Sequence, residues 1–364
     1  MPLLEVRDLT VSFHTADGLV QAVRGVSFSV EKGRTLGIVG ESGSGKTVST
    51  QALLGLTPGG EVTGQALFEG QDLLRMSRSQ LRAVRGARIA AIFQDPLSSL
   101  HPLYRVGWQI VEMIRAHQKV SKRAARARAI ELLTMVGIPQ AVSRVDDYPH
   151  QFSGGMRQRA MIAMALALNP DLIIADEPTT ALDATVQAQV IELMASLQSE
   201  LDSALIIITH DMGVIADMAD DVMVMYAGKA VEYADRRTLF YSPHHPYTTG
   251  LLESIPGSTG AGEKLRPIPG QPPSLIAIPS GCAFHPRCRY VMDRCLTTVP
   301  PLDEVGTNHR SACFLPELLQ GVGERVEADR RAAAEAHRTG RAAELAQRTV
   351  QASVGAGSSA ESGT

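Results

Sequence analysis

A glycine-rich stretch near the N-terminus has the composition and spacing of a loop that binds phosphate. The octapeptide "GESGSGKT" satisfies the pattern G-x-x-x-x-G-K-[ST]. Its glycines allow successive backbone N–H groups to curl around phosphate oxygens, and a helix starting here adds a partial positive charge. We expect Lys46 to bridge the outer phosphates of a nucleotide and Thr47 to offer its hydroxyl to Mg²⁺. The candidate nucleotide-binding residues of this stretch are Gly40, Ser42, Gly43, Ser44, Gly45, Lys46 and Thr47.

Acidic, histidine and glutamine side chains follow other apolar runs. Asp176 and Glu177 end "LIIADE", where the first carboxylate would hold the metal and the second would face an attacking water. His210 ends "ALIIITH" and could orient that water or the terminal phosphate. Gln94, within "IFQDPLSSL", could contact both the metal and the nucleophile. We therefore expect Thr47, Gln94 and Asp176 to bind Mg²⁺, and Glu177, His210 and Gln94 to form the catalytic centre.

A second glycine-rich stretch, "FSGGMRQR", stands far downstream and precedes a helix-type pattern, "MRQRAMIAMALAL". Ser153, Gly154 and Gly155 would present a hydroxyl, a backbone open to close approach and a helix N-terminus to an anion. One chain does not need two such sites for one phosphate group, so the second site requires an explanation of its own.

All four cysteines stand between residues 282 and 313, in the pattern C-x5-C-x6-C-x17-C, and we call this stretch the cysteine segment. A structural zinc site usually has a ligand pair about two to four residues apart, which this pattern lacks. Disulfides are rare in a cytosolic protein. Four thiolates could instead hold an iron–sulfur cluster, whose charge Arg287, Arg289 and Arg294 would offset. We expect a cluster, with zinc or unrelated thiols as alternatives, at Cys282, Cys288, Cys295 and Cys313.

The elements that must position these residues differ along the chain. Short, wholly apolar runs such as "TLGIVG", "DLIIADE" and "ALIIITH" indicate strands buried on both faces of a mainly parallel sheet. Open α/β sheets bind ligands beyond the carboxyl ends of their strands, where the candidate residues stand. Residues 1–35 instead alternate apolar and polar positions, which predicts a half-exposed antiparallel layer. A mostly helical subdomain is expected at about 97–165, where Ser121 can start a helix and Gly137 can end it.

The composition describes a folded chain without a global basic field. Its 364 residues are 44% hydrophobic and 20% charged, with a net charge of −3. A pI near 6.4 does not favour binding to nucleic acid. Apolar runs such as "AMIAMALAL" are shorter than the roughly 18–20 residues that span a bilayer, and "MPLLEVRDLTVSF" lacks the features of a secretory signal. We therefore expect a cytosolic protein.

These patterns divide the chain into three parts. Residues 1–257 are expected to form the nucleotide-binding domain, and residues 258–316, rich in Pro and Gly and holding the cysteines, a small separate module. Residues 317–364 begin as an Ala/Arg/Glu helix and finish in "GAGSSAESGT", whose composition is typical of disorder.

In chain order, "GESGSGKT", Gln94, "FSGGM", "LIIADEP", "ALD" and "ITH" resemble the Walker A, Q-loop, signature, Walker B, D-loop and H-loop motifs of ABC ATPases. The resemblance covers about residues 3–257. It implies an α/β P-loop ABC ATPase fold with an antiparallel β layer and a helical subdomain, and ATP and Mg²⁺ as cofactors. It also places Asp183 of the D-loop at the nucleotide, and an aromatic side chain against adenine, for which Phe13 is the candidate and His14 the alternative.

The resemblance also explains the second glycine-rich stretch. It implies a head-to-tail pair of ATPase domains with two ATP molecules between them. Each ATP is held by the Walker A loop of one chain and by the residues matching Ser153, Gly154 and Gly155 of the other. Met156 stands where the commonest signature has Gln; the resemblance to an uptake branch with two non-identical ATPase subunits, described next, implies a heterodimer whose sister subunit carries the Gln form.

The stretches "FSGGMRQRAMIAMAL", "IFQDPLSSLHPL", "HPYTTGLLESIP" and "GCAFHPRC" resemble the oligopeptide and dipeptide uptake branch, particularly the first of its two ATPase subunits. This implies two membrane permease subunits, an extracellular substrate-binding protein acting indirectly, and a peripheral position on the cytoplasmic face of the membrane. Some members carry a four-iron cluster on the matching cysteines. Alternatives are import of nickel or another small solute, a nucleic-acid-associated ABC ATPase and an exporter ATPase; the stretch between Lys46 and Ser153 has no sustained heptad pattern.

Overall fold

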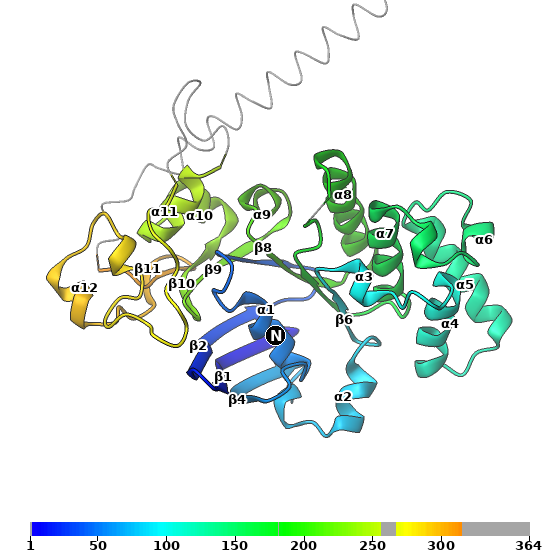
Figure 1. Cartoon of the computed structure of the whole chain (residues 1–364), viewed down its shortest axis with the longest axis horizontal. Coiled ribbons are helices and arrows are strands. Elements are labelled where there is room, and N and C mark those ends of the chain that lie inside the picture. The colour runs from blue at the N-terminus through cyan, green and yellow to red at the C-terminus, as the bar shows by residue number, and fades with distance from the viewer. Residues whose placement is uncertain (1, 181, 256–266, 315–364) are drawn as a thin grey trace, which may run out of the picture.

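The computed structural model describes residues 2–180, 182–255 and 267–314, and within them the chain forms two sheets with a helix between them (Figure 1). The smaller sheet is antiparallel, as the alternation of residues 1–35 predicts. Its strands, in spatial order, are β2 (Gly18–Val30), β1 (Leu4–Thr15), β4 (Gly60–Phe68) and β5 (Gln71–Asp72). Helix α1 (Lys46–Leu53) contacts both β1 and β2 from the side of the larger sheet.

The larger sheet carries the apolar runs. In spatial order its strands are β11 (Asp303–Gly306), β12 (His309–Ser311), β10 (Lys229–Asp235), β9 (Asp221–Tyr226), β3 (Thr35–Val39), β8 (Ala204–Thr209), β7 (Leu172–Asp176) and β6 (Ile89–Ile92). From β9 to β6 all neighbours are parallel. Strand β6 was not predicted from the sequence.

The parallel strands are apolar at nearly every position because each face of the sheet meets a different core. Leu36 and Ile38 of β3 pack into the core shared with the antiparallel sheet, whereas Val39 packs into the core on the opposite face. Ile207 and Ile208 of β8 divide between the same two cores. Since successive side chains of a strand point to opposite faces, both must be hydrophobic here.

Helices fill the stretch assigned to the helical subdomain, whose status as a unit stays a prediction (Figure 1). They are α3 (Pro96–Ser99), α4 (Val106–His117), α5 (Lys122–Met135), α6 (Ala141–Arg144), the 3₁₀ turn η2 (Pro149–Gln151) and α7 (Gly154–Ala165). The Ser121 hydroxyl accepts a hydrogen bond from the Ala124 amide at 3.2 Å, which caps α5. Gly137, with φ of +73°, lies just past the end of this helix.

The remaining helices connect or cover the strands. They are η1 (Leu73–Arg75), α2 (Arg78–Val84), α8 (Ala184–Leu201), α9 (Met212–Met218), α10 (Arg236–Tyr241), α11 (Pro246–Glu253), η3 (His285–Arg287) and α12 (Asp293–Thr297). Helices α8 and α9 lie on the face of the larger sheet opposite the antiparallel layer (Figure 1). In the described part of the chain, no helix is long and apolar enough to cross a membrane.

The C-terminal part of the described chain contributes a strand to the larger sheet, while the division into a separate module at residues 258–316 stays a prediction. Strand β12 pairs antiparallel with β10, with Ser311 opposite Glu232 and Arg310 opposite Tyr233. Backbone hydrogen bonds therefore join this segment to the larger sheet. The predicted helical and disordered tail, residues 317–364, lies outside the described residues.

Candidate functional site

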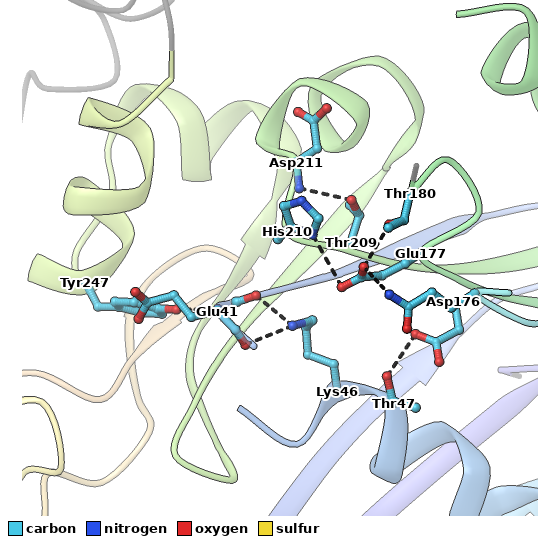
Figure 2. A network of polar contacts seen from close by, with 12 residues as sticks. Glu41, Lys46, Thr47, Asp176, Glu177, Thr180, Thr209, His210, Asp211 and Tyr247 are labelled. Atoms are coloured by element: carbon cyan, nitrogen blue, oxygen red, sulfur yellow. Dashed lines mark hydrogen bonds and ion pairs between the residues drawn. The ribbon is translucent and has the colours of Figure 1, made fainter. Parts of the chain in front are cut away.

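The candidate residues converge because the strands that precede them are parallel neighbours. Strands β3, β8, β7 and β6 lie side by side, so their carboxyl ends meet at one edge of the sheet. Gly40, His210, Glu177 and Gln94 follow these strands at that edge. Figure 2 shows Lys46, Thr47, Asp176, Glu177 and His210 gathered there.

The loop at residues 40–47, here called the phosphate loop, is folded tightly against its surroundings. Gly43 and Gly45 have φ values of +78° and +97°, in the left-handed region that favours glycine. A Cβ atom on Gly45 would lie 2.3 Å from the Ala22 carbonyl oxygen, so no side chain fits there. The Lys46 Nζ donates hydrogen bonds to the carbonyl oxygens of Gly40 at 2.7 Å and Glu41 at 3.0 Å. The loop thus curls around its own lysine.

The phosphate loop holds groups that a bound phosphate would satisfy. The buried Ser44 hydroxyl has no hydrogen-bond partner among the described residues. Burial lowers the pKa of Lys46, although Glu177, Asp176 and Glu41 act in the opposite direction. A phosphate oxygen here would accept from both groups and would stabilise the charged ammonium. The residues therefore fit a nucleotide phosphate.

Asp176 and Thr47 form a pair of oxygen ligands beside this loop. The Thr47 hydroxyl donates to an Asp176 carboxylate oxygen at 2.9 Å (Figure 2). Burial raises the pKa of Asp176, and the hydrogen bond from Thr47 partly opposes that rise. A hard cation such as Mg²⁺ takes hydroxyl and carboxylate oxygens as ligands, and its charge would favour the ionised carboxylate. The donor set fits Mg²⁺.

Glu177 is the centre of a hydrogen-bonded cluster (Figure 2). Its carboxylate accepts from the Thr180 hydroxyl at 2.8 Å and from the Gln94 side-chain amide at 3.1 Å, and the His210 Nδ1 lies 3.3 Å from its other oxygen. Its φ of +45° is uncommon for a residue with a side chain and stores backbone strain. The structure brings the predicted catalytic residues together around one carboxylate.

Sequence reasoning missed the residues that hold the phosphate loop from outside. The Arg287 guanidinium donates to both carboxylate oxygens of Glu41, at 2.6 and 2.9 Å, and the Glu41 amide donates to the Tyr247 hydroxyl at 2.7 Å. Arg287 also donates to the Pro269 carbonyl at 2.8 Å and is nearly fully buried. No local pattern signals this contact, because its partners stand 246 positions apart.

The second glycine-rich stretch forms the start of α7. The Ser153 hydroxyl caps the helix by accepting from the Met156 amide at 3.3 Å. A Cβ on Gly154 would meet open space, whereas a Cβ on Gly155 would lie 2.8 Å from a methyl group of Val186. Gly155 thus has a packing role in addition to the predicted one. In the described part of the chain, no hydrogen bond connects Ser153, Gly154 or Gly155 to the phosphate loop.

Asp183 and Phe13 each have a local role in the chain. Asp183 caps α8 by accepting from the amides of Thr185 and Val186, at 3.1 and 3.0 Å. The Phe13 ring packs against Gly60, where an added Cβ would lie 2.9 Å from a ring carbon. The alternative aromatic residue, His14, is exposed and lies 3.5 Å from a carboxylate oxygen of Glu61. Nucleotide contacts of Asp183 and Phe13 stay predictions.

The cysteine segment does not have the geometry of a metal site. Its four thiols line one cavity of about 20 Å³. Among the described residues, however, no three His, Cys, Asp or Glu side chains are placed to hold a metal ion. Burial raises the pKa of Cys282 and Cys288. The structure therefore does not support the predicted iron–sulfur cluster or the zinc alternative.

The three arginines that were expected to offset the charge of an iron–sulfur cluster contact other groups instead. Arg287 bonds Glu41, and Arg289 donates to a Glu253 carboxylate oxygen at 2.8 Å. Arg294 lies over the Phe314 ring at 4.0 Å.

Comparisons with known proteins place the chain among transporter ATPases. The family model for ABC transporters matches residues 23–180, and that for the oligopeptide/dipeptide transporter C-terminal region matches residues 231–295. The chain is 54% identical to oligopeptide transport ATP-binding protein OppD of Bacillus subtilis (strain 168), covering 84% of this chain and 87% of that protein. It is 50% identical to dipeptide transport ATP-binding protein DppD of the same organism, covering 86% of this chain and 95% of that protein.

A solved structure shares the fold. It is a dimeric, post-hydrolysis state of the ATP-binding cassette MJ0796 bound to ADP and phosphate, with a TM-score of 0.58 and 25% identity, covering 64% of this chain and 98% of that one. Fold and site together define a P-loop ATPase of the ATP-binding cassette class. Within that class, the chain belongs to the family of ATP-binding proteins of oligopeptide and dipeptide ABC transporters.

Proposed function

We propose that this chain is the ATP-hydrolysing subunit of an ABC importer that takes up dipeptides and oligopeptides through separate membrane subunits. The observation that carries the proposal is the meeting of the phosphate loop, the Thr47–Asp176 pair and the Glu177 cluster at one sheet edge. Family membership and identities of about half the residues to peptide-transport relatives support the peptide substrate. Import of nickel or another small solute is the alternative within the same mechanism.

Each cluster has a separate role in hydrolysis. Lys46 and the backbone amides of the phosphate loop would bind the outer phosphates of ATP, and Thr47, Asp176 and Gln94 would hold Mg²⁺. The metal, when bound, neutralises charge on the phosphates. Glu177 accepts a proton from the attacking water, while His210 and Gln94 hold its carboxylate in place. The strained backbone of Glu177 supports this role, because such strain recurs at functional residues.

The hydrolytic site is completed by a facing ATPase subunit. Ser153 and Gly154 are exposed at the start of α7, and a side chain added at Gly154 would meet open space. This surface can therefore approach a nucleotide on another chain. Dimeric assembly of the related cassette supports the arrangement. Met156, in place of the common Gln, favours a sister subunit of different sequence.

A groove beside Gln94 is the docking site that we assign to the membrane subunits. A cavity of about 250 Å³ with a mainly apolar lining lies between the end of α1 and the helices of the predicted subdomain. Phe93, next to Gln94, and the thioethers of Met113, Met161 and Met164 line it. Methionines adapt to irregular apolar partners. An apolar helix end from a permease would fit here and would place the chain at the cytoplasmic face of the membrane.

The four cysteines carry a further, separate proposal. All four line one cavity, and these thiols are the residues that would hold an iron–sulfur cluster of the kind found in the resembling family. Iron and acid-labile sulfide should then be found in stoichiometric amounts in protein purified without oxygen. A colourless preparation containing stoichiometric zinc would contradict this proposal and leave the ATPase proposal intact.

Reconstitution tests the proposed function. The chain is assembled with its sister subunit and permeases in proteoliposomes, and ATP hydrolysis is measured with a binding protein loaded with peptide or with nickel. Peptide should stimulate hydrolysis and uptake together. The variant Met164→Glu should lose the permeases on co-purification but keep ATP binding. Stimulation by nickel alone would contradict peptide import, and hydrolysis unaffected by Glu177→Gln would contradict the catalytic assignment.

A further inference from the structure

A second cavity, distinct from the phosphate loop, lies where the ATPase core meets the cysteine segment. Its volume is about 460 Å³, within the usual range for small-molecule sites. It is lined from the core by β2 and β10, and from the C-terminal side by residues 281–284, residues 299–302 and β12. None of the residues that line it belongs to the phosphate loop.

The cavity has an excess of positive charge. Arg24, Lys229 and Arg310 line it, and Asp8 is the acidic residue among the lining side chains. In the described part of the chain, none of these three cations forms an ion pair with a carboxylate. Arg24 donates to the Ala227 carbonyl at 3.3 Å, and Arg310 lies over the Tyr233 ring at 4.8 Å. With three half-buried cations and one carboxylate, the lining of the cavity carries a net positive charge.

Two of these cations, Arg24 and Lys229, lie close enough to repel each other. Burial lowers the pKa of Lys229, and the neighbouring Arg24 lowers it further. Burial also lowers the pKa of Arg24. The His245 and Tyr226 side chains do not add negative charge, because burial lowers the pKa of His245 to about 3 and raises the pKa of Tyr226. A bound anion would relieve this repulsion.

Part of the cavity lining is apolar. Phe284 is buried against the cavity, and Val299, Pro300, Pro301 and Leu302 follow one another along its side. A ligand with an organic ring could cover these side chains while its charged end meets the cations. The paired N–H donors of an arginine guanidinium and the ammonium of a lysine match phosphate oxygens in geometry and charge.

From this combination we propose that the cavity binds a small organic phosphate carrying at least two negative charges. The site is separated from the phosphate loop by a single turn. The Gly228 amide donates to the Ser44 carbonyl at 3.0 Å on one side of that turn, and the Arg24 amide donates to the Gly228 carbonyl at 2.8 Å on the other. The ligand would therefore bridge the core and the cysteine segment directly behind the ATP site.

Pyridoxal 5′-phosphate is a suitable probe because it carries both a phosphate and an aldehyde. The neutral Lys229 amine attacks the aldehyde carbon and water leaves, forming an imine. Borohydride then reduces the C=N bond to a stable secondary amine. Labelling is performed on the full chain with ADP and Mg²⁺ in excess, and each lysine-containing peptide is quantified by mass spectrometry. Lys119 and Lys122, both exposed on the surface, are the reference lysines, and Lys46 reports on occupancy of the ATP site.

We expect Lys229 to be labelled about tenfold faster than Lys119 or Lys122, and inorganic pyrophosphate to protect it while ADP still occupies the ATP site. Arg310→Gln should lower the labelling of Lys229 about tenfold, and Arg310→Lys should restore much of it. Unchanged ATP binding by Arg310→Gln shows that the fold is intact. Three results would each overturn the proposal. Lys229 could be labelled no faster than the reference lysines, or its labelling could be unchanged in Arg310→Gln. Chloride could also protect Lys229 as well as pyrophosphate does, which would indicate an adventitious ion only.

Discussion

The Arg287 guanidinium holds the Glu41 carboxylate through two hydrogen bonds, at 2.6 and 2.9 Å, although the residues stand 246 positions apart. Glu41 lies within the phosphate loop, and its carbonyl oxygen accepts from Lys46 at 3.0 Å. The Arg287 side chain is only 4% exposed. The cysteine segment thus contacts the phosphate loop through an ion pair whose guanidinium is buried.

Loss of this pair should loosen the phosphate loop. Arg287→Ala leaves Glu41 without its partner, and we expect KM for ATP to rise about tenfold with little change in kcat, because loop position affects binding more than chemistry. Arg287→Lys restores one of the two hydrogen bonds and should give an intermediate KM. Steady-state ATP titrations measure both values.

A matched control and a double variant separate this effect from general destabilisation. Arg289→Ala removes a neighbouring guanidinium whose partner is Glu253, and should leave KM unchanged. Glu41→Gln combined with Arg287→Ala should be little worse than the more impaired single variant, because the residues act as a pair. Additive effects would argue against the coupling.

Glu177→Gln should abolish hydrolysis without weakening ATP binding. The amide cannot accept a proton from water, so phosphate release should fall about 10²–10⁴-fold. Thr180→Val removes a hydroxyl that bonds the same carboxylate at 2.8 Å and should have a much smaller effect. Single-turnover hydrolysis by the assembled transporter is the measurement. Wild-type turnover by Glu177→Gln would show that another group is the base.

The neighbouring glycines of the signature stretch should respond differently to alanine. At Gly155 the new Cβ would lie 2.8 Å from Val186, and we expect the free energy of unfolding to fall by about 1 kcal/mol. At Gly154 nothing lies within 4 Å, so stability should be unchanged or slightly improved. Urea unfolding measures both. Val186→Ala should rescue Gly155→Ala, and failure to do so would place the clash elsewhere.

The free energy of unfolding should fall at acidic pH because His245 is buried. Burial lowers its pKa from 6.5 to about 3 in the folded chain. Between these values the unfolded state binds more protons, so the free energy of unfolding falls as the pH falls from 6.5, by up to about 1.4 kcal/mol per pH unit. Above pH 6.5 this contribution is constant.

His245→Asn tests this source of acid sensitivity. The His245 Nδ1 accepts from the Tyr247 amide at 3.1 Å, and an Asn oxygen can take over that bond without titrating. Urea unfolding at about pH 7.5 and about pH 5 should show a smaller difference for the variant than for the wild type. An equal difference in both proteins would assign the acid sensitivity to other groups.

The fold near the site could be predicted because its signals are local. The apolar runs before Gly40, Glu177 and His210 identify buried strands, and the spacing within residues 40–47 identifies the phosphate loop. Those features depend on neighbours a few positions apart. Strand β6 was missed because "IAAI" is short, and so short an apolar run does not distinguish a buried strand from a buried helix.

Long-range contacts could not be predicted in the same way. The pairing of β12 with β10 and the bond between Arg287 and Glu41 join distant parts of the chain without a periodic pattern. The cysteine spacing identified residues that share a cavity but not the state of their sulfurs. The structure shows that Gly154 is accessible at the start of α7, but a single chain does not show whether another subunit faces it.

The central claim is that each ATP is hydrolysed only between two subunits, and Gly154→Ala tests it most directly. Hydrolysis per chain is compared for the isolated subunit and the assembled transporter, in wild-type and variant forms, with ATP affinity measured alongside. We predict slow hydrolysis by the isolated chain, strong acceleration on assembly, and loss of that acceleration in the variant at unchanged affinity for ATP in the isolated chain. Full-rate hydrolysis by the isolated variant would contradict the account.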